Sequence, residues 1–348
     1  MSVTTELTRI QQAKADIAKA IKYRGGTVLN NSLISDYYNY IKSLNGYINY
    51  NPVQNAIVHN GLYYKTELDV IQGKPLWFKA AANSSSVTWY IKIAKTGSPD
   101  TKAIQYSLTE TVSSTTNQPN FSSWTTLTEN RYIAVKGNQY IGFRSNNTTP
   151  FSKNNSNYRT FSLSSSSSLQ ARLSFPIYSG GDVMSLMKGS YSLAGCPYCF
   201  FHLFMEQRDL CSAPQVCATT LSEGCFEGMF NKTSIITPPI LLAKTLAPRC
   251  YAGMFYGCTK LLVAPDLPAL SFAANCYDDL FGGCYKIHRI KCSTYKNWDS
   301  SATRNWLAGL PYGLFITEHP EVFPSSEGGI PSTWDVTAHE YNMSNYTV

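Results

Sequence analysis

Two cysteines stand close enough together in the sequence to suggest metal or redox chemistry. Cys196-Pro-Tyr-Cys199 has the C-x-x-C spacing of zinc ligands and of redox-active dithiols. A zinc site needs a second pair, and Cys211 and Cys217 do not have the spacing of a zinc ribbon. A thioredoxin-like site needs a βαβ unit, which the surrounding sequence does not predict. We therefore interpret these cysteines as structural and expect neither a metal nor a cofactor.

A pair of adjacent acids, Asp278-Asp279, has the residue type that general acid–base catalysis needs. Two acids on a turn are more often solvated, and we interpret Asp266 as a turn residue as well. The sequence contains no H-E-x-x-H, G-x-S-x-G, P-loop or G-x-G-x-x-G pattern. We expect no catalytic residues and no enzymatic activity. The histidines, which form no motif with one another or with acids, are His59, His202, His288, His319 and His339.

Tyrosine and tryptophan side chains are the ones that stack on sugar rings. The chain has 24 Tyr and 6 Trp. Trp77, Trp89 and Trp124 fall in a predicted β region, where burial in a core is the favoured role. The sequence does not identify which of four N-terminal tyrosines face solvent: Tyr47, Tyr50, Tyr63 and Tyr64.

The composition argues against several classes of partner. Charged residues make up 15% of the chain, and the formal net charge of +7 is spread without a Lys/Arg block, so we expect no nucleic-acid partner. The surface polarity must come from Ser, Thr, Asn and Tyr, a composition typical of extracellular β structure and of adhesive surfaces. No run of 18 apolar residues occurs, so we also expect no membrane partner.

The start of the chain has no segment of the kind that directs export. It lacks an apolar core of signal-peptide length and a cleavage site. We therefore expect the chain to fold in a reducing cytoplasm, with its ten cysteines, all between Cys196 and Cys292, as free buried thiols.

The sequence divides into four regions, and the first, residues 1–46, is predicted to be helical. Its apolar residues recur every three or four positions, which places them on one face of a helix that ends at Gly25-Gly26. A second short helix is expected over Ser32–Leu44. Isolated helices of this length are marginal, so the stripe must dock on this chain, on a copy of itself or on a larger assembly, and these alternatives stay open. The residues of the stripe are Leu7, Ile10, Ala13, Ile17 and Ile21.

Residues 52–178 are predicted to form a β-sandwich. Alternation of apolar and polar residues is clear in Val87–Ile93 and in Arg131–Lys136. Gly137-Asn138 predicts a hairpin turn from Arg131–Lys136 into Gln139–Arg144. The Ser162–Ser168 stretch is expected to be a polar loop. The remaining expected strands are Leu62–Val70, Pro75–Ala80, Ala103–Leu108, Trp124–Leu127 and Leu169–Ile177.

Residues 180–292 contain a repeat of 25 or 26 residues. Each unit has a Cys, a Phe five positions later and an aliphatic residue eleven positions after the Cys, and the first three units then carry Pro214, Pro239 or Pro265. Such a unit cannot bury its apolar face alone, so we predict a solenoid in which equivalent residues stack. The predicted repeat core consists of Cys199, Phe204, Leu210, Cys225, Phe230, Ile236, Cys250, Phe255, Leu261, Cys276, Phe281 and Ile287.

Residues 293–348 are predicted to close the solenoid as a C-terminal cap. The fourth repeat unit lacks the proline and gains charge after Ile287, as terminal units do. Trp298, Trp306 and Trp334 are expected in the core of the cap. The fold class is therefore a mainly β, multidomain chain: a short helical segment, a β-sandwich and a leucine-rich-repeat-like solenoid (α/β, or β with short helices) with its cap.

Several strings resemble those of a known family. Phe255-x-x-Cys258-x-x-Leu261-x-x-Ala264-Pro265 and Cys250-Tyr-Ala-Gly-Met-Phe-Tyr-Gly-Cys258 resemble the BspA-like leucine-rich repeats of Bacteroidetes surface proteins and their phages. The closing Gly329-Ile-Pro-Ser-Thr-Trp334 resembles the tail of many such proteins. The resemblance covers residues 180–340; in the first two units Gln207 and Thr233 replace the mid-repeat Cys.

The N-terminal segment resembles another group of proteins. Glu6-Leu-Thr-Arg-Ile-Gln-Gln-Ala-Lys-Ala-Asp-Ile-Ala-Lys-Ala-Ile21 is similar to N-terminal segments of virion proteins from Bacteroides phages, including crAss-like ones. Together the resemblances imply a virion head or tail fibre or decoration protein, with residues 1–46 attaching to capsid or tail proteins or forming a dimer or trimer. The repeats would then bind a host-surface or mucosal glycan or protein. A bacterial cell-surface adhesin is the alternative.

Overall fold

The computed structural model describes residues 71–95, 104–114, 116–127, 132–145, 159–187, 191–323 and 329–338. The chain divides into two compact units, Met1–Glu67 and Leu68–Val348, and the described residues all belong to the second. The predicted N-terminal helices, the predicted strand Leu62–Val70 and the four tyrosines between Tyr47 and Tyr64 lie outside the described residues. So do the proposed attachment residues Leu7, Ile10, Ile17 and Ile21.

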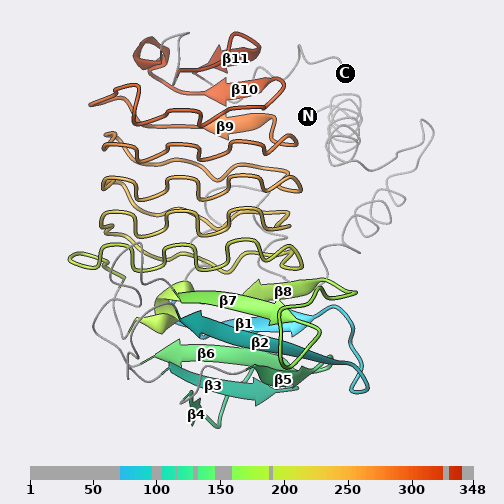
Figure 1. Ribbon diagram of the computed structural model, residues 1–348. Helices are drawn as coiled ribbons and strands as arrows, with labels where there is room; N and C mark the ends of the chain where they lie inside the picture. The colour runs from blue at the N-terminus through green and yellow to red at the C-terminus, as the bar shows by residue number, and fades with distance from the viewer. Residues whose placement is uncertain are drawn as a thin grey trace, which may run out of the picture. The chain divides into compact units, whose positions relative to one another are not determined.

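The described part is mainly β, as the sequence predicts, with two antiparallel sheets (Figure 1). One has five strands in the order β4-β3-β6-β1-β8, and the other has three in the order β5-β2-β7. The strands of the first are β1 (Leu76–Ala80), β3 (Ile104–Thr109), β4 (Thr125–Thr126), β6 (Tyr140–Ser145) and β8 (Ile177–Gly180). Those of the second are β2 (Thr88–Lys95), β5 (Ile133–Lys136) and β7 (Arg159–Ser164).

The two sheets face each other across a core of aromatic rings. The Phe78 ring of β1 lies 5.1 Å from the Phe161 ring of β7, and the Phe143 ring of β6 lies 5.1 Å from the same ring. In β2 the alternate residues Trp89 and Ile91 are fully buried. The period-two pattern seen in the sequence is therefore the pattern of side chains that enter this core.

The predicted hairpin is wrong. β5 pairs with β2, whereas β6 pairs with β1 and β3, so the Gly137-Asn138 turn carries the chain from one sheet to the other. The two strands lie in facing sheets, and each buries apolar residues against the other sheet. A hairpin would have placed both strands in the same sheet. A Cβ on Gly137 would stand 2.2 Å from the carbonyl oxygen of Ala82, so the turn packs directly on backbone.

The predicted Ser-rich loop is also wrong in its first half. β7 runs through Arg159–Ser164 and buries Phe161 and Leu163, at 0% and 3% exposure. The alternation of apolar residues in this strand was not recognised because Ser162 and Ser164 made the segment look like a polar loop. Ser164 is itself fully buried, and its hydroxyl donates to the Leu169 carbonyl at 2.7 Å. Of the predicted strand Leu169–Ile177, only Ile177 lies in a strand, because β8 begins at that residue.

Beyond the sheets, the repeat units lie one above another, as Figure 1 shows. Backbone N–H groups of each unit donate to carbonyls of the next, for example Phe200 to Cys225 at 2.8 Å and Phe226 to Cys250 at 3.0 Å. The rings at the position of Phe255 stack with centroid separations of 5.4, 5.8 and 5.8 Å. A second column of rings runs beside them. The two columns are Phe204, Phe230, Phe255 and Phe281, and Phe200, Phe226, Tyr251, Tyr277 and Trp306.

One residue of the predicted repeat core needs correction. Every other member is buried, but Ile236 is half-buried and the neighbouring Ile235 is fully buried. Unit two is one residue shorter between its Cys and its proline than units one and three. Counting four residues back from Pro239 therefore reaches Ile235, as the same count from Pro265 reaches Leu261.

The hydrophobic core continues from the sheets into the repeats. The Phe161 N–H of β7 donates to the Leu203 carbonyl at 2.9 Å, and the Phe161 ring lies 5.5 Å from that of Phe204. Buried residues from Leu76 to Trp334 form one cluster. This core runs without a break across residue 179, where the sequence predicts a boundary between two domains. That boundary stays a prediction.

The predicted cap region begins by continuing the same stacking. Tyr277 N–H donates to the Ala302 carbonyl at 2.9 Å, and the Trp306 ring lies 6.3 Å from the Tyr277 ring. Trp306 and Trp334 are buried, while Trp298 is partly buried against the core. A parallel sheet of order β11-β10-β9 follows, and it consists of β9 (Arg289–Lys291), β10 (Gly313–Ile316) and β11 (Trp334–Thr337). The short 3-10 helices are η2 (Val183–Leu186) and η3 (Pro320–Val322).

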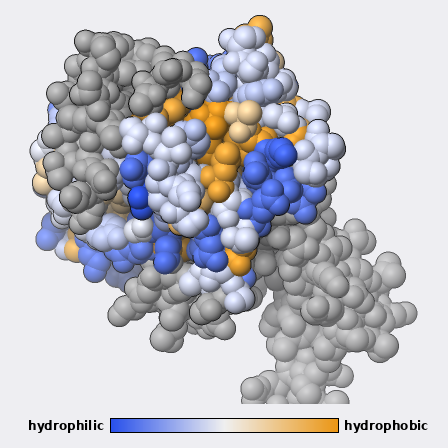
Figure 2. Space-filling view, turned by 90° about the horizontal axis from the view of Figure 1, so that it is seen from below, coloured by the Kyte–Doolittle hydropathy of each residue, from blue (hydrophilic) through white to orange (hydrophobic). Residues whose placement is uncertain are grey.

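The opposite end of the described unit carries β3 and β4. Figure 2 views the molecule from this end and shows hydrophobic residues gathered near its centre, with hydrophilic residues around them. Leu108 of β3 and Val112 just after it are 38% and 40% exposed.

The ten cysteines are free thiols, nine of them are buried, and some also donate hydrogen bonds. The Cys258 thiol donates to the Phe230 carbonyl at 3.0 Å, and the Cys284 thiol donates to the Phe255 carbonyl at 3.0 Å. Gln207 and Thr233, the substitutions in the first two units, also use this position for hydrogen bonds. Gln207 accepts from a β7 amide at 2.9 Å because unit one lies against a strand, and Thr233 donates to the Phe230 carbonyl at 2.9 Å.

Thiol labelling should separate one cysteine from the rest. Nine are buried and Cys211 is partly exposed. Burial raises the pKa of the Cys258 and Cys276 thiols to about 12, so very little reactive thiolate is present at neutral pH. We expect a maleimide to modify native protein at Cys211 first, at Cys196, which is 8% exposed, more slowly, and at the other eight only on unfolding, as counted by intact mass. Cys211→Ser should remove the early label; a second cysteine reacting equally fast would contradict the buried arrangement.

Candidate ligand-binding face of the repeats

The backbone of the repeats presents one outward face with a regular and costly conformation. Each of the four units has three residues in the left-handed region, spaced by four, as in Arg249, Gly253 and Gly257 with φ of 55°, 57° and 70°. A residue with a Cβ costs roughly 1–2 kcal/mol in this region, and glycine costs none. The full set is Tyr198, His202, Glu206, Gly224, Gly228, Lys232, Arg249, Gly253, Gly257, Asn275, Asp279 and Gly283.

The middle left-handed position singles out two side chains. Units two and three have Gly228 and Gly253 there, so glycine is accepted, yet units one and four have His202 and Asp279. The third position shows the same mixture, with Glu206 and Lys232 against Gly257 and Gly283, so the conformation alone does not mark a function. What distinguishes His202 and Asp279 is their surroundings. Both of these side chains border the same depression on the face.

This depression is a pocket with a volume of about 220 Å³. The volume lies below the range of about 300–1,000 Å³ typical of sites for drug-sized ligands, so it suits a single ring or a short side chain. Charged, amide and aromatic groups surround a floor of small residues. The lining residues are His202, Glu227, Gly228, Asn231, Arg249, Ala252, Gly253, Tyr256, Asp278 and Asp279.

The two glycines of the floor have different reasons to be there. A Cβ on Gly228 would stand 2.2 Å from Cδ2 of His202, so the imidazole lies directly over this glycine and closes one side of the pocket. A Cβ on Gly253 would meet nothing nearer than 3.9 Å, at Nδ2 of Asn231 and at Cβ of Tyr256. The space above Gly253 is therefore the open part of the pocket.

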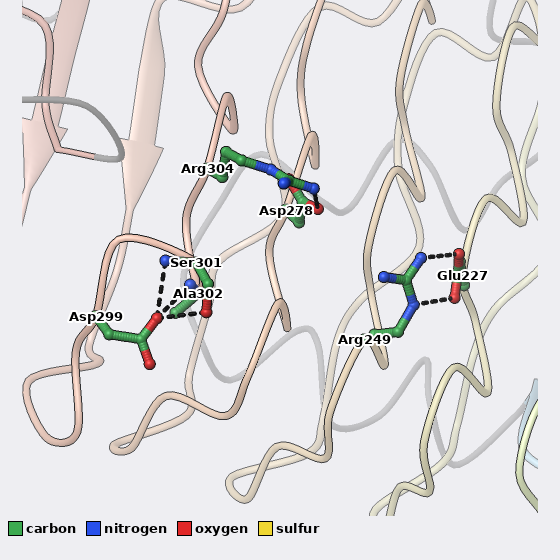
Figure 3. A network of polar contacts seen from close by, with 7 residues as sticks. All are labelled: Glu227, Arg249, Asp278, Asp299, Ser301, Ala302 and Arg304. Carbon is green, nitrogen blue, oxygen red and sulfur yellow. Dashed lines mark hydrogen bonds and ion pairs between the residues drawn. The ribbon is translucent and has the colours of Figure 1, made fainter.

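Two bidentate ion pairs, each joining neighbouring units, fix the charged walls. Arg249 donates to Glu227 at 3.0 Å through Nε and at 2.5 Å through Nη2, and Arg304 donates to Asp278 at 3.1 and 2.5 Å through the same atoms. Figure 3 shows each guanidinium aligned with one carboxylate. The paired geometry holds these groups in place, and the Arg249 side chain is still 40% exposed.

The same view shows how the layer after unit four begins (Figure 3). One carboxylate oxygen of Asp299 accepts from the backbone N–H of Ser301 at 2.8 Å and from that of Ala302 at 3.0 Å. The Ser301 hydroxyl also donates to Asp299 and lowers the pKa of that carboxyl. This turn positions the chain that carries Arg304 to its partner Asp278.

The two strained side chains have shifted pKa values. Burial lowers the pKa of His202 to about 4, against a smaller opposing effect of Glu206, so the imidazole is neutral at neutral pH. Burial, and then the neighbouring Asp278, raise the pKa of Asp279, against smaller opposing effects of Arg304 and of a side-chain hydrogen bond with Asn305. The pocket thus combines a neutral imidazole with a carboxylate whose charge is poorly solvated, and a donor from a ligand would stabilise that charge.

Asn231 supplies a polar atom that lacks a partner. Its Oδ1 is buried and makes no hydrogen bond within the part of the chain that the structure describes. A buried amide oxygen without a partner costs about 1–3 kcal/mol. A ligand group or a water that donates to it would recover this cost.

Two exposed tyrosines pack on glycines of the following layer, and one of them, Tyr256, belongs to the pocket lining. The Tyr256 ring packs over Gly282, where an added Cβ would stand 2.9 Å from Cδ2, and Tyr256 is 39% exposed. The Tyr285 ring packs over Gly309, with Cε1 3.2 Å from an added Cβ, and Tyr285 is 57% exposed. Each ring rests on glycine backbone and leaves much of its surface to solvent.

The structure places the residues that the sequence singled out in varied surroundings. Cys196 and Cys199 are buried thiols, and the described residues contain no cluster of three or more His, Cys, Asp or Glu side chains that could hold a metal ion. Trp77 and Trp89 are buried, whereas Trp124 is half-buried beneath the guanidinium of Arg144 at 4.1 Å.

The acids singled out in the sequence differ from one another. Asp278 was expected to be solvated, but its side chain is 6% exposed because Arg304 covers it. Asp266 is exposed and lies 3.5 Å from Arg289.

Sequence reasoning missed most of the pocket. The sequence shows His202 only as a histidine outside any motif. It gives no separate signal for Glu227, Asn231, Arg249 or Tyr256. One signal was available: aligning the units shows glycine in two of them where the other two have His202 and Asp279.

No protein-family model matches the chain, and no curated protein or solved structure matches it either. Among the helices that the structure describes, none has the length and hydropathy of a membrane span.

Proposed function

We propose that this protein is a bacteriophage virion component, a head or tail fibre or decoration protein, whose repeats bind a host-surface or mucosal glycan or protein. In this proposal residues 1–46 attach to capsid or tail proteins and bring the chains together as a dimer or trimer. The sheets would form a β-sandwich spacer, and the repeats would form a leucine-rich-repeat-like solenoid with a C-terminal cap. The protein would be made in the host cytoplasm and reside in the virion.

The pocketed face of the repeats is the observation that carries the binding part of this proposal. It gathers polar side chains around a floor of Gly228, Ala252 and Gly253, with Tyr256 beside them. Its two bidentate ion pairs hold the charged groups rigid, which lowers the entropy cost of binding. The attachment part is supported by the resemblance of Glu6–Ile21 to N-terminal segments of phage virion proteins.

Deleting residues 1–46 tests attachment. Particles grown with the truncated chain should lack it, because the predicted docking stripe is gone, whereas particles grown with the intact chain should carry it, as read by immunoblot of gradient-purified virions. Gold-labelled antibody to residues 200–290 should decorate intact particles and show the head or tail location. Truncated protein that still co-purifies with particles would refute the attachment role of this segment.

A bacterial cell-surface adhesin is the second candidate. The resemblance of residues 180–340 to BspA-like surface proteins favours it. Antibody to residues 200–290 that labels intact uninfected bacteria, and not particles, would establish this candidate in place of the first.

A further inference from the structure

The pocket has an excess of hydrogen-bond acceptors and of negative charge. Its lining holds the carboxylates of Glu227, Asp278 and Asp279. Arg249 pairs with Glu227, and Arg304, outside the lining, pairs with Asp278, so the carboxylate of Asp279 is the excess charge. An anionic ligand would meet this negative excess, and the guanidinium that would bind it already pairs with Glu227. The pocket therefore disfavours sialylated or sulfated groups.

The pocket also presents donors and acceptors side by side. The Asn231 amide has Oδ1 without a partner within the described residues, and Nδ2 near the open floor. Arg249 keeps N–H groups at a partly exposed side chain, and the Asp279 carboxylate, which has a side-chain hydrogen bond with Asn305, has further lone pairs that can accept. A hydroxyl group both donates and accepts, so several hydroxyls on one ring would use this mixture more fully than a single ammonium or carboxylate would.

The aromatic rings add the second element of sugar recognition. A pyranose ring has a face of C–H groups that packs on the electron-rich face of an aromatic ring. Tyr256 lines the pocket, and Tyr285 lies on the next unit, with its hydroxyl 3.8 Å from an added Cβ on Gly283. Glycine at 282 and 283 keeps the surface between the two rings low.

We propose that the pocket between His202 and Asp279 binds one ring of an uncharged sugar, and that Tyr256 and Tyr285 carry the following rings of the same oligosaccharide. Asp279 and Asn231 take the hydroxyl hydrogens, Arg249 donates to a ring or hydroxyl oxygen, and the neutral imidazole of His202 closes the end of the site. This inference rests on the proposed function, since it names the ligand class and the site for the receptor-binding role.

The test uses the full-length chain and arrays of immobilised oligosaccharides that end in neutral hexoses or N-acetylhexosamines, with sialylated and sulfated counterparts. The wild type should bind members of the neutral set and bind their anionic counterparts more weakly. Asp279→Gly and Tyr256→Ala should each raise the Kd for the best neutral probe by roughly tenfold or more.

The variants are chosen so that a loss of binding cannot be due to a loss of folding. Asp279→Gly installs the residue that units two and three already have. It relieves a left-handed φ of 53°, which offsets the lost hydrogen bond with Asn305, so the variant should fold about as well as the wild type. Lys232→Gly is the matched control, because Lys232 also has a left-handed φ, of 55°, but lies outside the pocket lining. Its Kd should equal that of the wild type.

The outcomes separate the two proposals. Neutral-glycan binding that survives both pocket variants, or a preference for anionic glycans, would overturn the sugar site and leave the receptor-binding role intact. No binding to any glycan on the arrays would also overturn it, whereas absence of the protein from particles would overturn the virion role whatever the arrays show.

Discussion

Replacing Phe255 with alanine should lower the free energy of unfolding by about 3–5 kcal/mol. The side chain is fully buried, and its ring stacks on Phe230 and Phe281 at 5.8 Å with interplanar angles of 2° and 8°. Removing it opens a cavity between two layers that cannot close without shifting the backbone hydrogen bonds between units. Equilibrium unfolding in urea, followed by tryptophan fluorescence, measures the change.

A neighbouring exposed ring provides the control. Tyr285→Ala removes an aromatic side chain that is 57% exposed, so its cost should be about 1 kcal/mol or less. If Phe255→Ala cost no more than Tyr285→Ala, the stacked column would not be a main source of stability.

Asp182→Ala should cost about 2–6 kcal/mol, from about 1–3 kcal/mol for each of the two buried N–H groups, those of Met184 and Cys217, that lose their acceptor. The carboxylate is fully buried and accepts from three backbone N–H groups: that of Gly73 before β1 at 3.1 Å, that of Met184 in η2 at 2.9 Å and that of Cys217 in the first repeat unit at 3.4 Å. The change would weaken the junction between sheets and repeats, so both should unfold together at lower urea. Fluorescence and far-UV circular dichroism should report one shared transition.

Asp182→Asn separates the hydrogen bonds from the charge. It keeps one acceptor oxygen, so it should cost less than the alanine variant at neutral pH. Burial raises the pKa of Asp182 above 3.8, although the three backbone hydrogen bonds oppose the rise. The folded protein then binds this proton more tightly than the unfolded chain does, so lowering the pH through the folded pKa towards 3.8 should favour the wild type over the asparagine variant. An asparagine variant as unstable as the alanine variant would contradict the acceptor role.

The inward-facing residues of the repeats were predictable because their type recurs with their position. Phe204, Phe230, Phe255 and Phe281 each fill the same interior slot, so period and side chain agree. Ile235 was not predicted because unit two has one residue fewer between its cysteine and its proline. The position eleven residues after the cysteine is therefore Ile236, whereas counting back from the proline reaches Ile235.

The outward-facing residues were not predictable in this way. His202, Gly228, Gly253 and Asp279 share a backbone conformation but not a residue type, so a search for recurring types passes over them. The pocket exists because the types differ, with small residues in the middle units and larger ones at either side. Only the stacking of the units places these four positions in one line.

The sheets illustrate a different limit. The expected strands match β1, β2, β3 and β6 to within about two residues. Alternation could not decide which sheet each strand joins, because β5 and β6 both bury alternate residues and a two-residue turn serves a hairpin or a crossing between sheets equally well. In β7 both serines are buried, and the Ser164 hydroxyl is hydrogen-bonded, so polarity did not mark solvent exposure.

The direction of the hydrogen bonds between units has a mechanical consequence. They join one layer to the next, from Phe161–Leu203 beside the sheets to Phe281–Trp306 near the far end. A load that separates the two ends of the stack pulls along these bonds, so they break one layer at a time and not all together. Each detached repeat of about 25 residues would lengthen the chain by roughly 85 Å when extended. The repeats would therefore act as a series of breakable links, lengthening in steps under a load applied along the stack.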